Sequence, residues 1–199
     1  MDAISPVDAI RPWLPFIVPI VVLQLILMVV ALLDLVRRAK AAGFPFVQLN
    51  TNGLRLAAEP ELADGLREAG LDSAFLQFDG ADDSAHLVLR GRSLLEAKLR
   101  AVENLGRAGV GVVLVPTVVP GVNDDGLGDL LRLAVALSPA VRGIHFQPVS
   151  YFGRYPAPPR DADRITLPEL MAGLEAQSGG LVRVRDFQPP GCEIGRAHV

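Results

Sequence analysis

The chain has 199 residues, enough for one domain with a sizeable hydrophobic core. Hydrophobic residues make up 50% of it, and a mean hydropathy of +0.35 is high for an ordinary soluble domain, which indicates a membrane segment. The net charge of −3, from 19 basic and 22 acidic residues, gives no support for nucleic-acid binding, which calls for a basic surface.

The sequence is poor in residues that ligate metals. Its single cysteine, Cys192, excludes an internal disulfide and a metal site built from this chain's thiolates alone. The histidines, His86, His145 and His198, are widely separated and form no zinc-binding spacing.

The excess hydrophobicity lies near the start of the chain. Over residues 13–33 the only strongly polar side chain is Gln24, and a bilayer core of about 30 Å needs about 20 helical residues. Basic residues follow at 37–40, and such flanks stay cytoplasmic. We therefore predict that residues 13–36 cross a membrane once, with Met1 outside and the C-terminal domain in the cytoplasm. The alternatives are a signal peptide and a buried helix.

After this segment, short apolar runs alternate with helical patterns. Glycines that typically end helices follow three of the predicted helices, at Gly43, Gly70 and Gly109. In chain order the sequence predicts a helix ending at residue 42, strand 47–49, helix 60–69, strand 74–78, helix 94–108, strand 110–119, helix 126–137, strand 141–149, a loop over 151–164, helix 167–175 and a possible strand at 181–184.

Strands separated by helices predict parallel pairing and an α/β fold. Four β/α units are too few to close an eight-stranded barrel. We therefore expect a transmembrane helix with its flanks over 1–40, an incomplete parallel (βα) barrel with about four strands over 41–192, and an unstructured tail over 193–199. An open doubly wound sheet is the alternative, although the sequence has neither GxGxxG nor GxxxxGK[ST].

The predicted strands end in distinctive polar motifs, and ligands of such folds bind at the C-terminal ends of strands. The motifs are Asn50-Thr51-Asn52-Gly53, Leu76-Gln77-Phe78-Asp79-Gly80, Pro120-Gly121-Val122-Asn123-Asp124 and His145-Phe146-Gln147-Pro148-Val149-Ser150. The first three resemble the TNG, SLDG and GVND elements of radical S-adenosylmethionine (radical SAM) enzymes. The last is similar to the branch that includes tetraether lipid synthase-like proteins. The resemblance covers about residues 35–193.

The resemblance implies radical chemistry that depends on S-adenosylmethionine (SAM) and a [4Fe–4S] cluster, acting on a small molecule that the sequence does not identify. It implies that the cofactor is contacted by Thr51, Asn52, Gln77, Asp79 and Gln147. It also implies that Cys192 would ligate an auxiliary cluster if the chain continued into further cysteines, and otherwise Cys192 is an unpaired thiol. The residues themselves leave plainer roles open, because asparagine and glycine are turn formers and Asp79 can cap a turn. A buried glutamine such as Gln77 needs hydrogen-bond partners, which favours a ligand contact.

One part of the family pattern is missing. Family members bind the cluster through a CxxxCxxC loop, whose three thiolates a single cysteine cannot supply, and the family's GGE element is absent too. We therefore expect this chain to bind neither cofactor and to be inactive by itself, with no catalytic residue assigned. The alternative is a membrane-anchored, non-catalytic interaction module.

Both ends of the chain differ from that family. Residues 1–38 resemble the N-terminal membrane segment of phospholipase D-nuclease-type proteins, which ends in a string like Asp34-Leu35-Val36-Arg37-Arg38. Residues 193–199 resemble a translated sequencing adapter. These two features predict that the reading frame joins unrelated pieces by misassembly, and a genuine gene fusion is the alternative.

Overall fold

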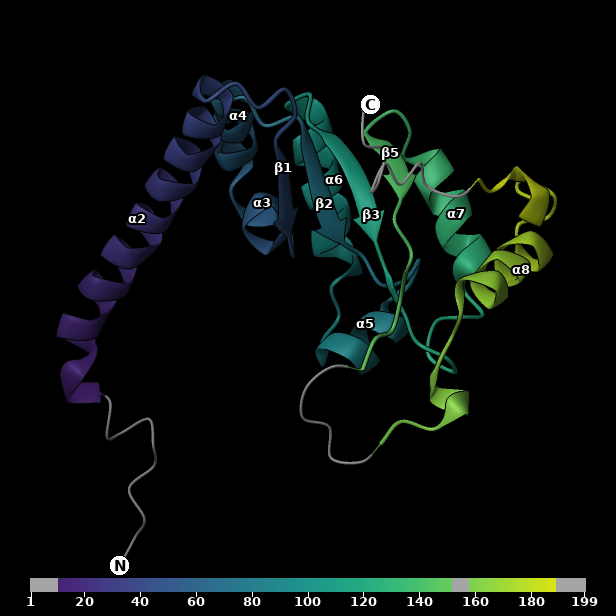
Figure 1. The fold of residues 1–199 in the computed structure, drawn as a ribbon. Helices are drawn as coiled ribbons and strands as arrows, with labels where there is room; N and C mark the ends of the chain where they lie inside the picture. Colours follow the sequence, from purple (N-terminus) through teal and green to yellow (C-terminus); the bar gives the residue numbers. More distant parts are fainter. Residues whose placement is uncertain (1–10, 152–157, 189–199) are drawn as a thin grey trace, which may run out of the picture.

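Figure 1 shows the fold in a computed structural model, which describes residues 11–151 and 158–188. A short 3₁₀ helix, η1 (Arg11–Trp13), leads into the long helix α2 (Leu14–Ala41). The later helices are α3 (Leu54–Ala58), α4 (Pro60–Ala69), α5 (Asp83–Arg90), α6 (Leu95–Arg107), α7 (Leu127–Ala136) and α8 (Leu167–Gln177), with 3₁₀ helices η2 (Asp161–Asp163) and η3 (Val184–Asp186).

Four strands form one parallel sheet, in which the order of the strands in space follows their order in the chain (Figure 1). They are β1 (Gln48–Thr51), β2 (Ser73–Gln77), β3 (Gly111–Val115) and β5 (Val141–Ile144). Past their C-terminal ends, β4 (Thr117–Val118) pairs in parallel with β6 (Gln147–Pro148). The predicted α/β class with a four-stranded parallel sheet is confirmed, whereas the incomplete barrel stays a prediction.

Helices cover one face of this sheet. On that face Leu76 and Leu114 are fully buried in a core that also contains side chains from α3, α4, α6 and α7. Phe75 and Gln77 lie on the other face and are only half-buried, because side chains alternate along a strand. This open face of β2 leads to the strand ends that carry the polar motifs.

Several predicted elements differ from the observed ones. The single strands expected over 110–119 and 141–149 are each divided in two. Pro116 separates β3 from β4, because proline has no N–H to donate to a neighbouring strand. The possible strand at 181–184 is wrong, since that segment contains no strand and ends at the start of η3.

Two helices, α3 and α5, were not predicted. The apolar residues of α5 do not form the buried stripe by which amphipathic helices are recognised. In α5, Leu87 and Val88 are exposed, and the buried residues are Ala85 and His86. Helix α5 begins instead through a local cap, in which the Asp82 carboxylate accepts a hydrogen bond from the Ser84 amide.

The apolar helix α2 consists of two differently packed parts. Near its C-terminal end Val36 is buried in the core, and Leu33 lies against Gly65 of α4. Its most apolar stretch has a mean hydropathy of 3.0 and none of it is buried, and Phe16 is 68% exposed. Figure 1 shows this part running away from the sheet. Among the described residues α2 is the one helix long and apolar enough to cross a membrane.

Candidate functional site

The C-terminal ends of the strands border an open cavity of about 370 Å³, which we name the edge cavity. Residues from four separate chain segments and α5 meet there. Its lining consists of Asn50, Thr51, Asn52, Phe75, Gln77, Arg90, Val115, Thr117 and Gln147. Four of the five residues expected to contact a cofactor, Thr51, Asn52, Gln77 and Gln147, are thus brought together, and Asp79 is not among the lining residues.

The turn after β1 is held by its own side chains. Thr51 Oγ1 accepts a hydrogen bond from the Gly53 amide at 3.0 Å, and Asn52 Oδ1 accepts one from the Leu54 amide at 3.2 Å. Gly53 has a φ of +77°, and a Cβ there would collide with Leu76. The side chains of Thr51 and Asn52 therefore stabilise the turn, and both residues also line the cavity.

Asp79 is buried below the edge cavity, where it binds Arg90. Its oxygens accept hydrogen bonds from Arg90 Nε at 2.8 Å and Nη2 at 3.0 Å, and Oδ1 also accepts one from the Thr117 amide at 3.2 Å. The hydrogen bonds from Arg90 to this carboxylate raise the pKa of the guanidinium. Asp79 thus fixes a permanent positive charge at the wall of the cavity.

Arg90 is the charged residue in this lining, and it was not among the residues predicted to contact a cofactor. It is the last residue of α5, and because α5 was not predicted, no pattern placed Arg90 near Asp79. Gln77 also turns toward it: with its amide oxygen facing the guanidinium, Gln77 accepts a hydrogen bond from Arg90 Nη1 at 2.9 Å. A signal did exist in the sequence, since Arg90 directly precedes Gly91, which closes the helix in the left-handed conformation.

Two further ionisable side chains are buried near Asp79. His86 Nδ1 lies 3.9 Å from Asp79 Oδ2, and its ring meets the Phe78 ring edge-on at 5.8 Å between centroids. Burial lowers the pKa of His86. Burial likewise lowers the pKa of Lys98 to about 8.

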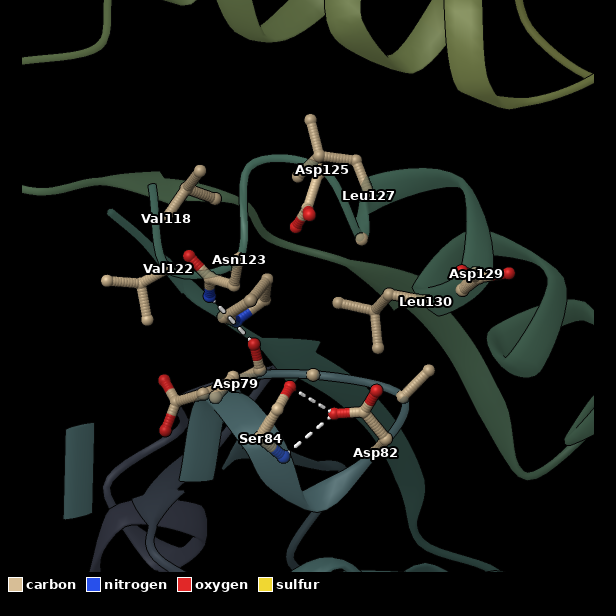
Figure 2. A pocket seen from close by; sticks show the side chains of 15 residues that line it. Asp79, Asp82, Ser84, Val118, Val122, Asn123, Asp125, Leu127, Asp129 and Leu130 are labelled. Atoms are coloured by element: carbon tan, nitrogen blue, oxygen red, sulfur yellow. Dashed lines mark hydrogen bonds between the residues drawn. The ribbon is translucent and has the colours of Figure 1, made fainter. Parts of the chain in front are cut away.

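A second cavity, of about 230 Å³, lies between the loop after β2 and the segment that joins β4 to α7 (Figure 2). Figure 2 shows Asn123 directed at the Asp79 carbonyl, to which its Nδ2 donates a hydrogen bond at 2.8 Å. Asn123 also donates to the Thr117 carbonyl and accepts from the Val119 amide. The GVND motif therefore joins two loops and directs Asn123 away from the edge cavity.

His145 and Tyr151 are not among the described residues that line the edge cavity. His145 packs against Phe75 on the open face of the sheet, with ring centroids 5.7 Å apart. The Tyr151 hydroxyl donates a hydrogen bond to the Asp163 carbonyl at 2.7 Å. Cys192 falls outside the described residues, and within them no three His, Cys, Asp or Glu side chains gather closely enough to hold a metal ion.

Comparison with known proteins adds a sequence relationship to this geometry. The sequence model of the radical SAM superfamily matches residues 25–134. The chain is 43% identical to the 7,8-dihydro-6-hydroxymethylpterin dimethyltransferase of Methanocaldococcus jannaschii over 157 residues. This stretch is 78% of this chain and 31% of that protein. It is 31% identical over 106 residues to a probable GTP 3',8-cyclase of Pyrococcus horikoshii, covering 52% of this chain and 32% of that protein.

A third relative is the mycofactocin maturase MftC of Mycolicibacterium smegmatis. It is 29% identical over 102 residues, which are 51% of this chain and 26% of that protein. The chain spans about a third of the length of the curated relatives it matches. The superfamily match begins inside α2 and runs past the motifs at the ends of β1, β2 and β4.

Proposed function

The chain belongs to the radical SAM superfamily, and we propose that its edge cavity is one part of a SAM-binding site within an incomplete (βα) barrel. Strands that follow one another in chain order, with all their covering helices on one face, support the barrel. The observation that carries the proposal is the convergence of Thr51, Asn52, Gln77 and Gln147 on one cavity beside Arg90. Because of this convergence we propose SAM binding, whereas the sequence alone led us to expect that the chain binds neither cofactor.

The proposed contacts follow from the chemistry of the lining. SAM has a carboxylate at its amino-acid end, and the Arg90 guanidinium is the group in the lining that suits an anion. The amides of Asn52, Gln77 and Gln147 offer donors and acceptors to the polar atoms of the ligand. Asp79 contributes indirectly, because it holds Arg90 in place. When bound, SAM would supply the bond whose reductive cleavage begins the radical chemistry of the family.

The same residues do not fit a [4Fe–4S] cluster. The cluster needs several thiolates, and the 199 residues contain one cysteine, Cys192. We therefore propose that these 199 residues, taken alone, neither assemble the cluster nor cleave SAM. Cys192 remains our candidate for one ligand of an auxiliary cluster whose other ligands would come from elsewhere.

Binding of S-adenosylhomocysteine tests the proposal, because this molecule keeps the amino-acid and adenosine ends of SAM. The full chain in detergent micelles is expected to bind it, and Arg90→Gln is expected to weaken binding about tenfold or more. Arg107→Gln, which removes an exposed arginine paired with Asp64, is the matched control and should bind like the wild type. Absence of binding, or equal binding by Arg90→Gln and wild type, would contradict the proposal.

We also propose that residues 13–36 anchor the chain in a membrane as a single span, with the domain on the cytoplasmic side. Supporting this are the unburied apolar stretch of α2 and the basic residues near its C-terminal end, including Arg38 and Lys40. A chain that stays in membranes but binds no S-adenosylhomocysteine would favour the non-catalytic interaction module instead.

A further inference from the structure

Lys98 is a charged residue in a position that normally belongs to an apolar one. It lies on α6 with its side chain fully buried, and the other buried residues of that helix are Ala101, Val102 and Leu105. Lysine is almost never fully buried without a partner, because taking an ammonium group out of water is costly. A side chain kept there at such a cost calls for a specific role.

The partner of Lys98 is a backbone carbonyl in the turn after β1. Lys98 Nζ donates a hydrogen bond to the Asn52 carbonyl oxygen at 2.5 Å, which joins α6 to a residue 46 positions earlier in the chain. The turn segment, residues 50–53, contributes three lining residues to the edge cavity. Lys98 thus contacts the wall of the cavity from beneath without lining it.

The charges around Lys98 are unevenly balanced. The Asp79 carboxylate favours the charged form of Lys98, whereas the positive charges of Arg90 and Arg92 oppose it. His86 lies in the same buried cluster. The Asp79 carboxylate is already engaged by the Arg90 guanidinium. The Asn52 carbonyl is therefore the direct acceptor that Lys98 has, and the hydrogen bond is strong only while the ammonium keeps its proton.

We propose that Lys98 is a positioning residue, whose ammonium holds the Asn52 carbonyl and so fixes the turn of residues 50–53 in the conformation that lines the edge cavity. The effect on ligand binding rests on the proposed function, whereas the effect on the turn does not. Loss of the proton weakens this hydrogen bond, and loss of the side chain removes it, so that the Asn52 carbonyl is held less firmly against α6.

Hydrogen exchange of the full chain in detergent micelles tests the role in the turn. The reporters are the Gly53 and Leu54 amides, which are bonded within the turn. In Lys98→Met, a variant of similar length and no charge, their protection is expected to fall about tenfold. Arg100→Met is the matched control, because it removes an exposed cation paired with Glu96 from the same helix, and it should leave the turn unchanged.

The wild-type chain provides a second readout that needs no variant. Because the pKa of Lys98 is about 8, protection of these two amides, corrected for intrinsic exchange, is expected to fall between pH 7 and pH 9. The same change should be absent in Lys98→Met. Unchanged protection in both Lys98→Met and the wild-type pH series would overturn the inference.

Ligand binding separates this inference from the proposed function. S-adenosylhomocysteine is expected to bind Lys98→Met about tenfold more weakly than wild type, and more weakly to wild type at pH 9 than at pH 7. If wild type binds nothing while the turn still loosens in Lys98→Met, the proposed function fails and the role of Lys98 stands. If wild type binds and Lys98→Met binds equally well, the role of Lys98 in the site fails.

Discussion

Lys40, near the end of α2, lies 2.5 Å from the carboxylate of Asp72, the residue just before β2. The same carboxylate oxygen accepts a hydrogen bond from the Val47 amide at 2.7 Å, and Lys40 also donates to the Pro45 carbonyl at 2.9 Å. This cluster joins the end of the apolar helix to the first two strands. The last part of α2 therefore packs as part of the α/β domain, independently of whether the first part of α2 lies in a membrane.

The first prediction concerns this junction. The hydrogen bond from Lys40 lowers the pKa of Asp72, so the pair stabilises the fold above the ordinary carboxyl pKa and loses that contribution as pH falls below it. Asp72→Asn is expected to lower the free energy of unfolding by about 1 kcal/mol at pH 7, and by less and less as the pH falls through the lowered pKa of Asp72. Thermal unfolding in detergent measures this, with Asp64→Asn, from an exposed pair, as the control.

The second prediction concerns the membrane. The full chain expressed in bacteria is expected to stay with membranes after a carbonate wash. Leu23→Arg, at a 56% exposed position in the middle of the apolar stretch, should shift it toward the soluble or aggregated fraction, because a central arginine costs about 2.5–3.5 kcal/mol on insertion. Arg37→Leu leaves the stretch apolar and is the control. Recovery of wild type as a soluble protein would contradict the membrane proposal.

The third prediction concerns Asp79 and Arg90. Asp79→Asn removes the charge from a buried carboxylate and leaves the guanidinium of Arg90, which is one-third exposed, without its ion pair. The free energy of unfolding is expected to fall by about 2 kcal/mol, less than for a fully buried pair. Asp129→Asn, from an exposed pair on α7, should change it by less than about 0.5 kcal/mol. Chemical denaturation in detergent compares the two variants.

The fourth prediction concerns the cost of burying Lys98. Its pKa falls from 10.5 to about 8 on folding, so between these pH values the unfolded chain binds more protons and stability rises with pH. Lys98→Met should remove this rise and increase the melting temperature at pH 7 by a few degrees, at about 2–4 °C per kcal/mol. A residue that served stability alone would give the opposite sign, namely a lower melting temperature in the variant.

The fifth prediction concerns cluster assembly. Anaerobic reconstitution of the full chain with iron and sulfide is expected to give no absorbance of a [4Fe–4S] cluster, because one cysteine cannot replace the several thiolates that it needs. Incubation with SAM and a reductant should release no 5′-deoxyadenosine beyond a protein-free control. A cluster signal that disappears in Cys192→Ser would show instead that chains share their cysteines to build one.

The sequence by itself determined the features that depend on near neighbours. It gave the bounds of α4, residues 60–69, without error, and it predicted left-handed glycines at Gly43, Gly70 and Gly109. Alternation along β2 puts Phe75 and Gln77 on the face opposite Leu76. These features follow from local rules, since only glycine adopts a positive φ cheaply and successive side chains of a strand point to opposite faces.

Only the tertiary structure decided which groups shape the site. The motif residues Asn52 and Gln77 were recognised as candidates, but the charges that hold them, Arg90 and Lys98, were not. Lys98 lies among the buried apolar residues of α6, although a lysine is normally expected to be exposed to solvent. Its partner, Asn52, lies 46 residues earlier in the chain. No local rule fixes such a pairing, because the gain that offsets the burial of a charge comes from a partner that folding alone brings within hydrogen-bond distance.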